Sequence, residues 1–200
     1  MKILKLLVIA GAIILIPVYV YLVASGKYSQ RIKHISGEKK VEEIMDLPVE
    51  KRTLAAEEYL KGSFSSSKIE NELIAAQMYI VYRHKSTELM QNKCKMVNSD
   101  ISYYIKKFNE YNNRYETKSK TILSAHSISE QAVQQKSIDG AVAALNDEID
   151  VTLKNENITL QELCFSINQM ADEVASDSTF DKVLPNAAEI LEQYQTKISN

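Results

Sequence analysis

Hydrophobic residues recur every three or four positions through the middle of this chain. A repeat of this length is typical of one buried helical face, whereas a half-buried strand alternates with period two. The clearest run is spaced 4-3-4-3-4-3-4 and consists of Met90, Cys94, Val97, Ile101, Tyr104, Phe108, Tyr111 and Tyr115. The same spacing leads into this run from Ile69. The pattern predicts a long amphipathic helix.

The continuity of the pattern predicts one helix over residues 68–123, about 80 Å long by rise alone. Ser67 and Glu70 have the spacing of a capping box at its start. Residues 98–100, Asn-Ser-Asp, interrupt the helix with side chains that compete for backbone hydrogen bonds. A loop would normally reset the hydrophobic phase, which is kept here, so we favour one helix and hold a break at 98–100 as the alternative.

Shorter helical segments follow. A short helix is expected around 130–136, and a hydrophobic stripe predicts a separate helix over 138–153. After a turn at 155–157, Thr159 and Glu162 have capping-box spacing and begin another helix. A turn at 176–179 then leads to the last helix, which begins near Phe180 and resumes after Pro185.

With only five Gly and three Pro and no strictly alternating segment, the chain is expected to be all-α. The expected architecture is an N-terminal transmembrane helix followed by an antiparallel helical bundle or coiled-coil hairpin built on the long helix. The bundle domain would span residues 47–200, beginning with a helix from Leu47 to about Lys61.

The N-terminal segment is the most apolar part of the sequence. No charged residue occurs from Leu6 to Gly26, 21 residues that span about 30 Å as a helix. We interpret residues 1–26 as a transmembrane anchor, with residues 6–26 in the membrane and 27–46 as a juxtamembrane linker. A signal peptide is the alternative, but this apolar run exceeds the usual length of its hydrophobic region.

The orientation of the anchor follows from two opposing signals. The bases after the apolar run outnumber Lys2 and Lys5 before it, which favours a cytoplasmic body by the positive-inside rule. A compact basic start that leads directly into an apolar run is, however, the layout of an export signal. We expect a single-pass membrane protein with an extracytoplasmic body, periplasmic or at the cell surface; a cytoplasmic body is the alternative.

Two cysteines, Cys94 and Cys164, lie 70 positions apart on apolar helical faces. In an exported protein they could form a disulfide. Free thiols are also common small core residues, so the sequence leaves both states open.

The charged residues exclude several classes of function. The formal charge is −2, and the chain after residue 26 carries 22 bases and 26 acids, so no nucleic-acid partner is expected. The three His are isolated, the five Gly are solitary, and no metal-ligand spacing occurs. We expect no enzyme activity, cofactor or metal. The acidic stretch 146–150, which includes Glu148, is interpreted as the solvated face of a helix.

Six of the eleven tyrosines lie between Tyr79 and Tyr115. Tyr104, Phe108, Tyr111 and Tyr115 share the hydrophobic stripe and are the candidate partner-binding residues, because tyrosine suits half-buried interfaces. Ordinary helix packing is the competing interpretation of these residues.

We expect a non-catalytic, membrane-anchored interaction or scaffold protein of the cell envelope, with a protein partner or a second copy of itself. The alternative is an extracytoplasmic helical-bundle sensor or ligand-binding module, which requires an enclosed pocket near residues 104–115 with a few convergent polar groups. A solid core there would count against it.

Overall fold

The computed structural model describes residue 64 and residues 67–194. Within this part of the chain every regular element is a helix and no strand occurs, so the all-α prediction is confirmed there. The predicted anchor (1–26), linker (27–46) and first bundle helix (47–61) lie outside the described residues. Among the residues described, no helix has both the length and the apolar character that a bilayer crossing requires.

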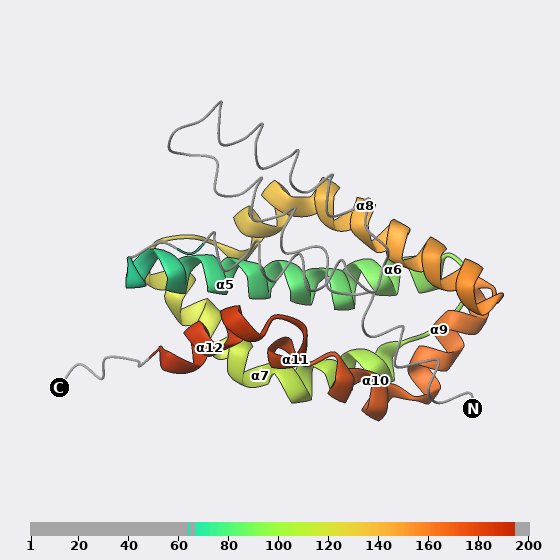
Figure 1. Ribbon diagram of the computed structural model, residues 1–200. Helices are drawn as coiled ribbons and strands as arrows, with labels where there is room; N and C mark the ends of the chain where they lie inside the picture. The colour runs from blue at the N-terminus through green and yellow to red at the C-terminus, as the bar shows by residue number, and fades with distance from the viewer. Residues whose placement is uncertain (1–63, 65–66, 195–200) are drawn as a thin grey trace.

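The helices form a bundle. In chain order they are α5 (Lys68–His84), the π-helical turn η1 (Lys85–Leu89), α6 (Met90–Lys95), α7 (Ser102–Ala125), α8 (Glu130–Glu156), α9 (Leu160–Gln169), α10 (Ala171–Asp177), α11 (Phe180–Val183) and α12 (Pro185–Gln193). The three longest of these, α5, α7 and α8, lie alongside one another (Figure 1).

The prediction of one helix over 68–123 is wrong, and the alternative break occurs. Helix α6 ends at Lys95, and Asn98 adopts a left-handed backbone conformation with φ 55°, which asparagine tolerates better than most residues. The Ser99 N–H donates to the Cys94 carbonyl at 3.0 Å, and Asp100 Oδ1 accepts from the Ser102 N–H at 3.0 Å. These local bonds satisfy the backbone at both helix ends.

The hydrophobic phase is kept across the break because both helices face the same core. Tyr79 on α5 packs beside Tyr115 on α7, and Tyr82 packs beside Phe108, with ring centroids 6.2 and 5.5 Å apart. Residue numbers thus rise on α5 while they fall on α7, which makes the two helices antiparallel. An unbroken pattern here indicates a helical hairpin.

Helix α5 is the central helix of the bundle. Helices α7 and α12 pack against it, and α8 lies on its other side (Figure 1). Nearly every residue from position 75 to position 87 is buried, whichever way it points. A helix that is apolar all round belongs in an interior, and α5 is such a helix in its second half.

Helix α8 is a single helix where two were predicted. It begins at the Ser129 cap, whose side chain accepts from the Ala132 N–H, and it continues past Ser137 to Glu156. The Ser137 hydroxyl donates to the Val133 carbonyl at 2.8 Å, so this side chain stays within the helix and does not begin a new one. Asn157, with φ 51°, then ends the helix where a turn was predicted.

A group of five buried rings, called here the aromatic core, joins α5 and α7 to the C-terminal segment. Its members are Tyr79, Tyr82, Phe108, Tyr115 and Phe180. The Phe180 ring lies 5.2–5.8 Å from those of Tyr79, Tyr82 and Tyr115. Asn112 is buried beside these rings, and its side-chain oxygen accepts from the Phe180 N–H at 2.8 Å. This bond fixes the start of α11 on the bundle.

Candidate functional site: a polar cavity at the π-helical turn

The π-helical turn η1 directly follows the central helix α5 and contains three buried polar residues. Lys85, Ser86 and Thr87 are all buried there. The Thr87 hydroxyl donates to the Arg83 carbonyl at 2.8 Å, one turn back. Short π-helical insertions are rare and are frequent at functional sites, because the extra residue changes the direction of the side chains around it.

Lys85 forms a buried ion pair with Glu148 on α8. The Lys85 Nζ lies 2.9 Å from both carboxylate oxygens. The Lys85 side chain is only 1% exposed and the Glu148 side chain 10%. Charged groups are buried at a high desolvation cost, which their mutual attraction offsets only with close geometry.

Burial shifts the pKa of each partner in the direction that favours its neutral form. Desolvation raises the pKa of Glu148 to about 7, although the Lys85 charge opposes the shift. Desolvation also lowers the pKa of Lys85, against the effect of Glu148. Glu148 therefore exchanges its proton near neutral pH, well above the range of an exposed glutamate.

The ion pair lines a cavity of about 60 Å³ between η1 and helices α6, α7, α8, α9 and α10. Most of its wall is aliphatic, and its polar lining comes from Lys85, Ser86, Tyr104, Glu148 and Thr152. The apolar lining residues are Met90, Leu145, Ile149, Leu163, Ile167 and Val174. An apolar pocket with a few convergent polar groups is the common form of a small-molecule site.

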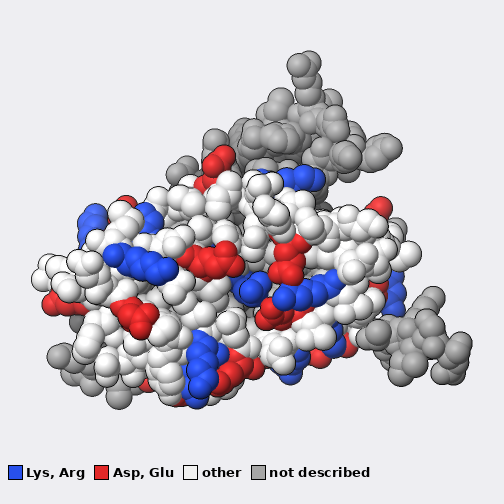
Figure 2. All heavy atoms as spheres, turned by 180° about the vertical axis from the view of Figure 1, so that it is seen from behind, with Lys and Arg blue, Asp and Glu red and all other residues white. Residues whose placement is uncertain are grey.

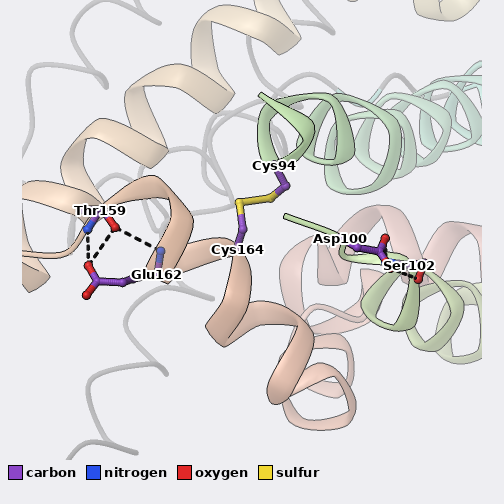
Figure 3. The surroundings of a disulfide bond; sticks show 6 residues. All are labelled: Cys94, Asp100, Ser102, Thr159, Glu162 and Cys164. Carbon is purple, nitrogen blue, oxygen red and sulfur yellow. Dashed lines mark hydrogen bonds between the residues drawn. A yellow bond between two sulfur atoms is a disulfide. The ribbon is translucent and has the colours of Figure 1, made fainter. Parts of the chain in front are cut away.

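A disulfide, shown in Figure 3, joins two of the helices that contribute to this cavity. It joins Cys94 at the end of α6 to Cys164 in α9, with the two Cα atoms 5.7 Å apart. Cys94 lies one turn after Met90, and Cys164 directly follows Leu163, so the crosslink connects two walls of the cavity.

Local side-chain hydrogen bonds lie at the starts of α9 and α7, near the disulfide (Figure 3). Thr159 and Glu162 form the predicted capping box: the Thr159 N–H donates to Glu162 Oε2 at 2.8 Å, and the Glu162 N–H donates to Thr159 Oγ1 at 3.2 Å. Asp100 accepts from the Ser102 hydroxyl at 2.7 Å at the start of α7. Helices α7 and α9 therefore start at fixed positions beside the crosslink.

The four candidate partner-binding residues occupy three different environments. Tyr104 lines the cavity, whereas Phe108 and Tyr115 belong to the aromatic core. Tyr111 is 43% exposed, because the buried face of α7 continues through Asn112. The buried stripe of α7 thus passes through Asn112, one residue after the predicted Tyr111. The four candidate residues do not form one surface.

The two charged residues of the cavity were not among the sequence-predicted site residues. Glu148 does not lie on a solvated helix face as interpreted; it shares the inner face of α8 with Leu145, Ile149 and Thr152. Their spacing of three and four places all of them on one side of the helix. For Lys85, the available signal was its position three residues after the apolar run 78–82.

Surface charges differ from the buried pair in their surroundings. On the face turned away from the viewer in Figure 1, basic and acidic side chains are interspersed (Figure 2). Exposed pairs include Lys106–Glu110 at 3.9 Å and Arg114–Glu192 at 3.2 Å. Pairs of this kind contribute little to stability. In residues 64 and 67–194, no group of three or more His, Cys, Asp or Glu is arranged to hold a metal ion.

Comparison with known proteins found no relative of this chain. No protein-family model matches the chain, and no curated protein or solved structure matches it either.

Proposed function

We propose that this chain is a helical-bundle sensor or ligand-binding module that takes a small molecule into the cavity at η1. The observation that carries the proposal is the buried Lys85–Glu148 pair on the wall of an otherwise aliphatic cavity. A stable fold does not require such a pair, since well-packed apolar residues of similar volume serve as well or better. Its position on the wall of a cavity favours recognition of a polar group.

A module of this kind fits the predicted cellular location. Residues 6–26 would anchor the chain in a membrane, with the bundle outside the cytoplasm. The Cys94–Cys164 disulfide supports this part of the proposal, because disulfides persist in oxidising compartments such as the periplasm and the cell surface.

A second candidate function is the docking of a protein partner, as a scaffold of the envelope would require. The exposed side chains of Met96 and Phe165, 74% and 61% accessible, favour it. Each lies within two residues of a bonded cysteine. The continuous 68–123 helix no longer supports this candidate, because the chain turns back at 96–101.

Methyl NMR of the full chain in a mild detergent tests ligand binding. The probes are three four-carbon compounds: butyrate, n-butylamine and n-butanol. Binding of any of them should shift the methyl signals of Leu145, Ile149 and Ile167 in a saturable manner, because these side chains line the cavity.

A matched pair of variants shows whether the shifts come from the cavity. Val174→Phe fills the cavity and should abolish them. Ile190→Phe, at a half-buried position on α12 away from the lining, should leave them unchanged. Absence of saturable shifts with all three probes, or their persistence in the Val174→Phe variant, would exclude the proposed function.

A further inference from the structure

We infer that the ligand of this cavity is a short aliphatic monocarboxylate whose carboxylate pairs with Lys85. This inference rests on the proposed function and adds the chemical class of the ligand. It is drawn from the composition of the lining, the charge of the buried pair, and the size of the cavity.

The polar lining consists mainly of groups that donate hydrogen bonds. Lys85 carries an ammonium, which only donates, and Ser86, Tyr104 and Thr152 carry hydroxyls, which donate as well as accept. Glu148 is the exception, and both of its oxygens already accept from Lys85. A ligand with a strong acceptor group complements this set better than a ligand with donors only.

The charge balance of the pair also favours an anion. Lys85 and Glu148 together are neutral, so any charged ligand leaves an uncompensated charge unless one partner changes its protonation state. An anion on Lys85 is balanced when Glu148 takes up a proton. Because the pKa of Glu148 is already about 7, that proton is gained near neutral pH at little cost. A cation would require the ammonium of Lys85 to lose its proton instead.

The groups around Glu148 allow this proton to stay on it. They are Lys85 on η1, Tyr82 on α5, Tyr104 on α7 and Asp147 on α8 itself, while α9 and α10 contribute the apolar Leu163, Ile167 and Val174. Burial raises the pKa of both tyrosines further, so their hydroxyls are neutral at physiological pH. Asp147 disfavours the ionised form of Glu148.

The cavity volume sets the part of a ligand that can be taken up at a few atoms. Since one water molecule needs about 10–15 Å³ by this measure, 60 Å³ holds roughly four waters or a ligand of about four to six non-hydrogen atoms. Butyrate lies at the upper end of that range. Its alkyl chain would contact the aliphatic wall, which gives the site its preference over inorganic anions.

Calorimetric titration of the full chain with butyrate tests the inference, with n-butanol and n-butylamine as matched probes of the same chain length. Butyrate should bind the most tightly of the three. Titration in two buffers of different ionisation enthalpy should reveal proton uptake on binding. Above the pKa of Glu148 the affinity should fall, by about tenfold or more between pH 6 and pH 8.5.

Two substitutions distinguish recognition from a structural role of the pair. Glu148→Gln imitates the protonated carboxyl, so it should keep butyrate binding and lose the pH dependence. Lys85→Met should weaken butyrate binding at least about tenfold, as loss of a charge-assisted hydrogen bond predicts. Lys106→Met, which removes an exposed lysine paired with Glu110, is the matched control and should change nothing.

The possible outcomes separate the inference from the proposed function. If butanol or butylamine binds in the cavity and butyrate does not, the carboxylate inference is wrong and the binding module stands. Butyrate binding without proton uptake, or undiminished in the Lys85→Met variant, would also overturn the inference.

Discussion

The aromatic core and the polar cavity lie side by side along the central segment α5–η1, and they are filled in different ways. In the aromatic core five rings interlock, and Asn112 and the Tyr82 hydroxyl bond to backbone groups of the C-terminal segment. Around the cavity the walls are aliphatic, a charged pair is buried, and about 60 Å³ is unfilled. Close packing is the general condition of protein interiors, so the cavity is a region of the bundle that is not optimised for stability alone.

The difference is also one of chain topology. The rings of the aromatic core come from α5, α7 and the start of α11, which brings sequence-distant segments together. The cavity is bounded by α8, α9 and α10, and the disulfide ties α9 to α6. We infer that the aromatic core determines whether the bundle forms. The residues that line the cavity can change while the bundle persists.

The largest expected effect is in the aromatic core. Phe180→Ala should lower the free energy of unfolding by about 4–5 kcal/mol, because it removes a fully buried ring that contacts three others. Phe165→Ala is the control at an exposed position and should cost less than about 0.5 kcal/mol. Chemical denaturation of both variants measures the difference, and equal losses would contradict the distinction between the two sites.

The next largest effect is expected in the cavity. Glu148→Leu leaves the Lys85 charge buried without this carboxylate and should cost about 3–4 kcal/mol at pH 7. The double variant Lys85→Met/Glu148→Leu should recover most of that loss, because apolar residues of similar volume replace the pair. A double variant as unstable as the single one would mean that the pair is needed for the fold.

The pH dependence of stability provides a second measure of the same pair. Since the pKa of Glu148 is raised from 4.5 to about 7 on folding, the folded state binds the proton more tightly. The contribution of Glu148 to the free energy of unfolding is therefore fully present below about pH 4.5 and is lost as the pH rises to about 7. Denaturation curves across this range should show the decline in the wild type and lack its Glu148 component in the double variant.

Loss of the disulfide should have a smaller effect, confined to the cavity side. Cys94→Ala/Cys164→Ala opens a loop of 70 residues and should cost about 2–3 kcal/mol. Hydrogen exchange should accelerate in α6 and α9 more than around Phe180. Uniform acceleration throughout the bundle would show that the two regions are not separate in their stability.

The smallest effect is expected at the capping box. Thr159→Ala removes the side-chain acceptor at the start of α9 and should cost about 1 kcal/mol. Thr117→Ala, at an exposed position inside α7, is the matched control and should be close to neutral. Thermal unfolding followed by circular dichroism compares the two variants.

The sequence was sufficient to predict the helical elements that local signals determine. The Thr159 capping box and the restart at Pro185 lie where their residues predicted them. The turn predicted at 155–157 begins later, because residues 155 and 156 still belong to α8, which Asn157 caps. The hairpin at 96–101 was assigned to the less favoured alternative, because a continuous hydrophobic phase is the same in one long helix and in two helices that share a core.

The candidate site was less predictable because it depends on tertiary contacts. Glu148 resembles its acidic neighbours in sequence, and only the approach of Lys85 from another helix explains its burial. The shift of the α7 face from Tyr111 to Asn112 likewise depends on α11, whose Phe180 N–H requires an acceptor at that point. Neither contact has a local sequence signature.

The disulfide has a further consequence for the way the chain would respond to a protease. It closes a covalent ring that contains the whole of α7 and α8, joined at the exposed turn of His126 and Ser127. One cut at that turn would yield two fragments that stay linked, so the nicked protein would migrate as a single species until a reductant is added. After a single cut anywhere inside the ring, the two fragments therefore stay joined by the disulfide. A cut between α10 and α12 lies outside the ring and separates the C-terminal fragment from the rest of the chain.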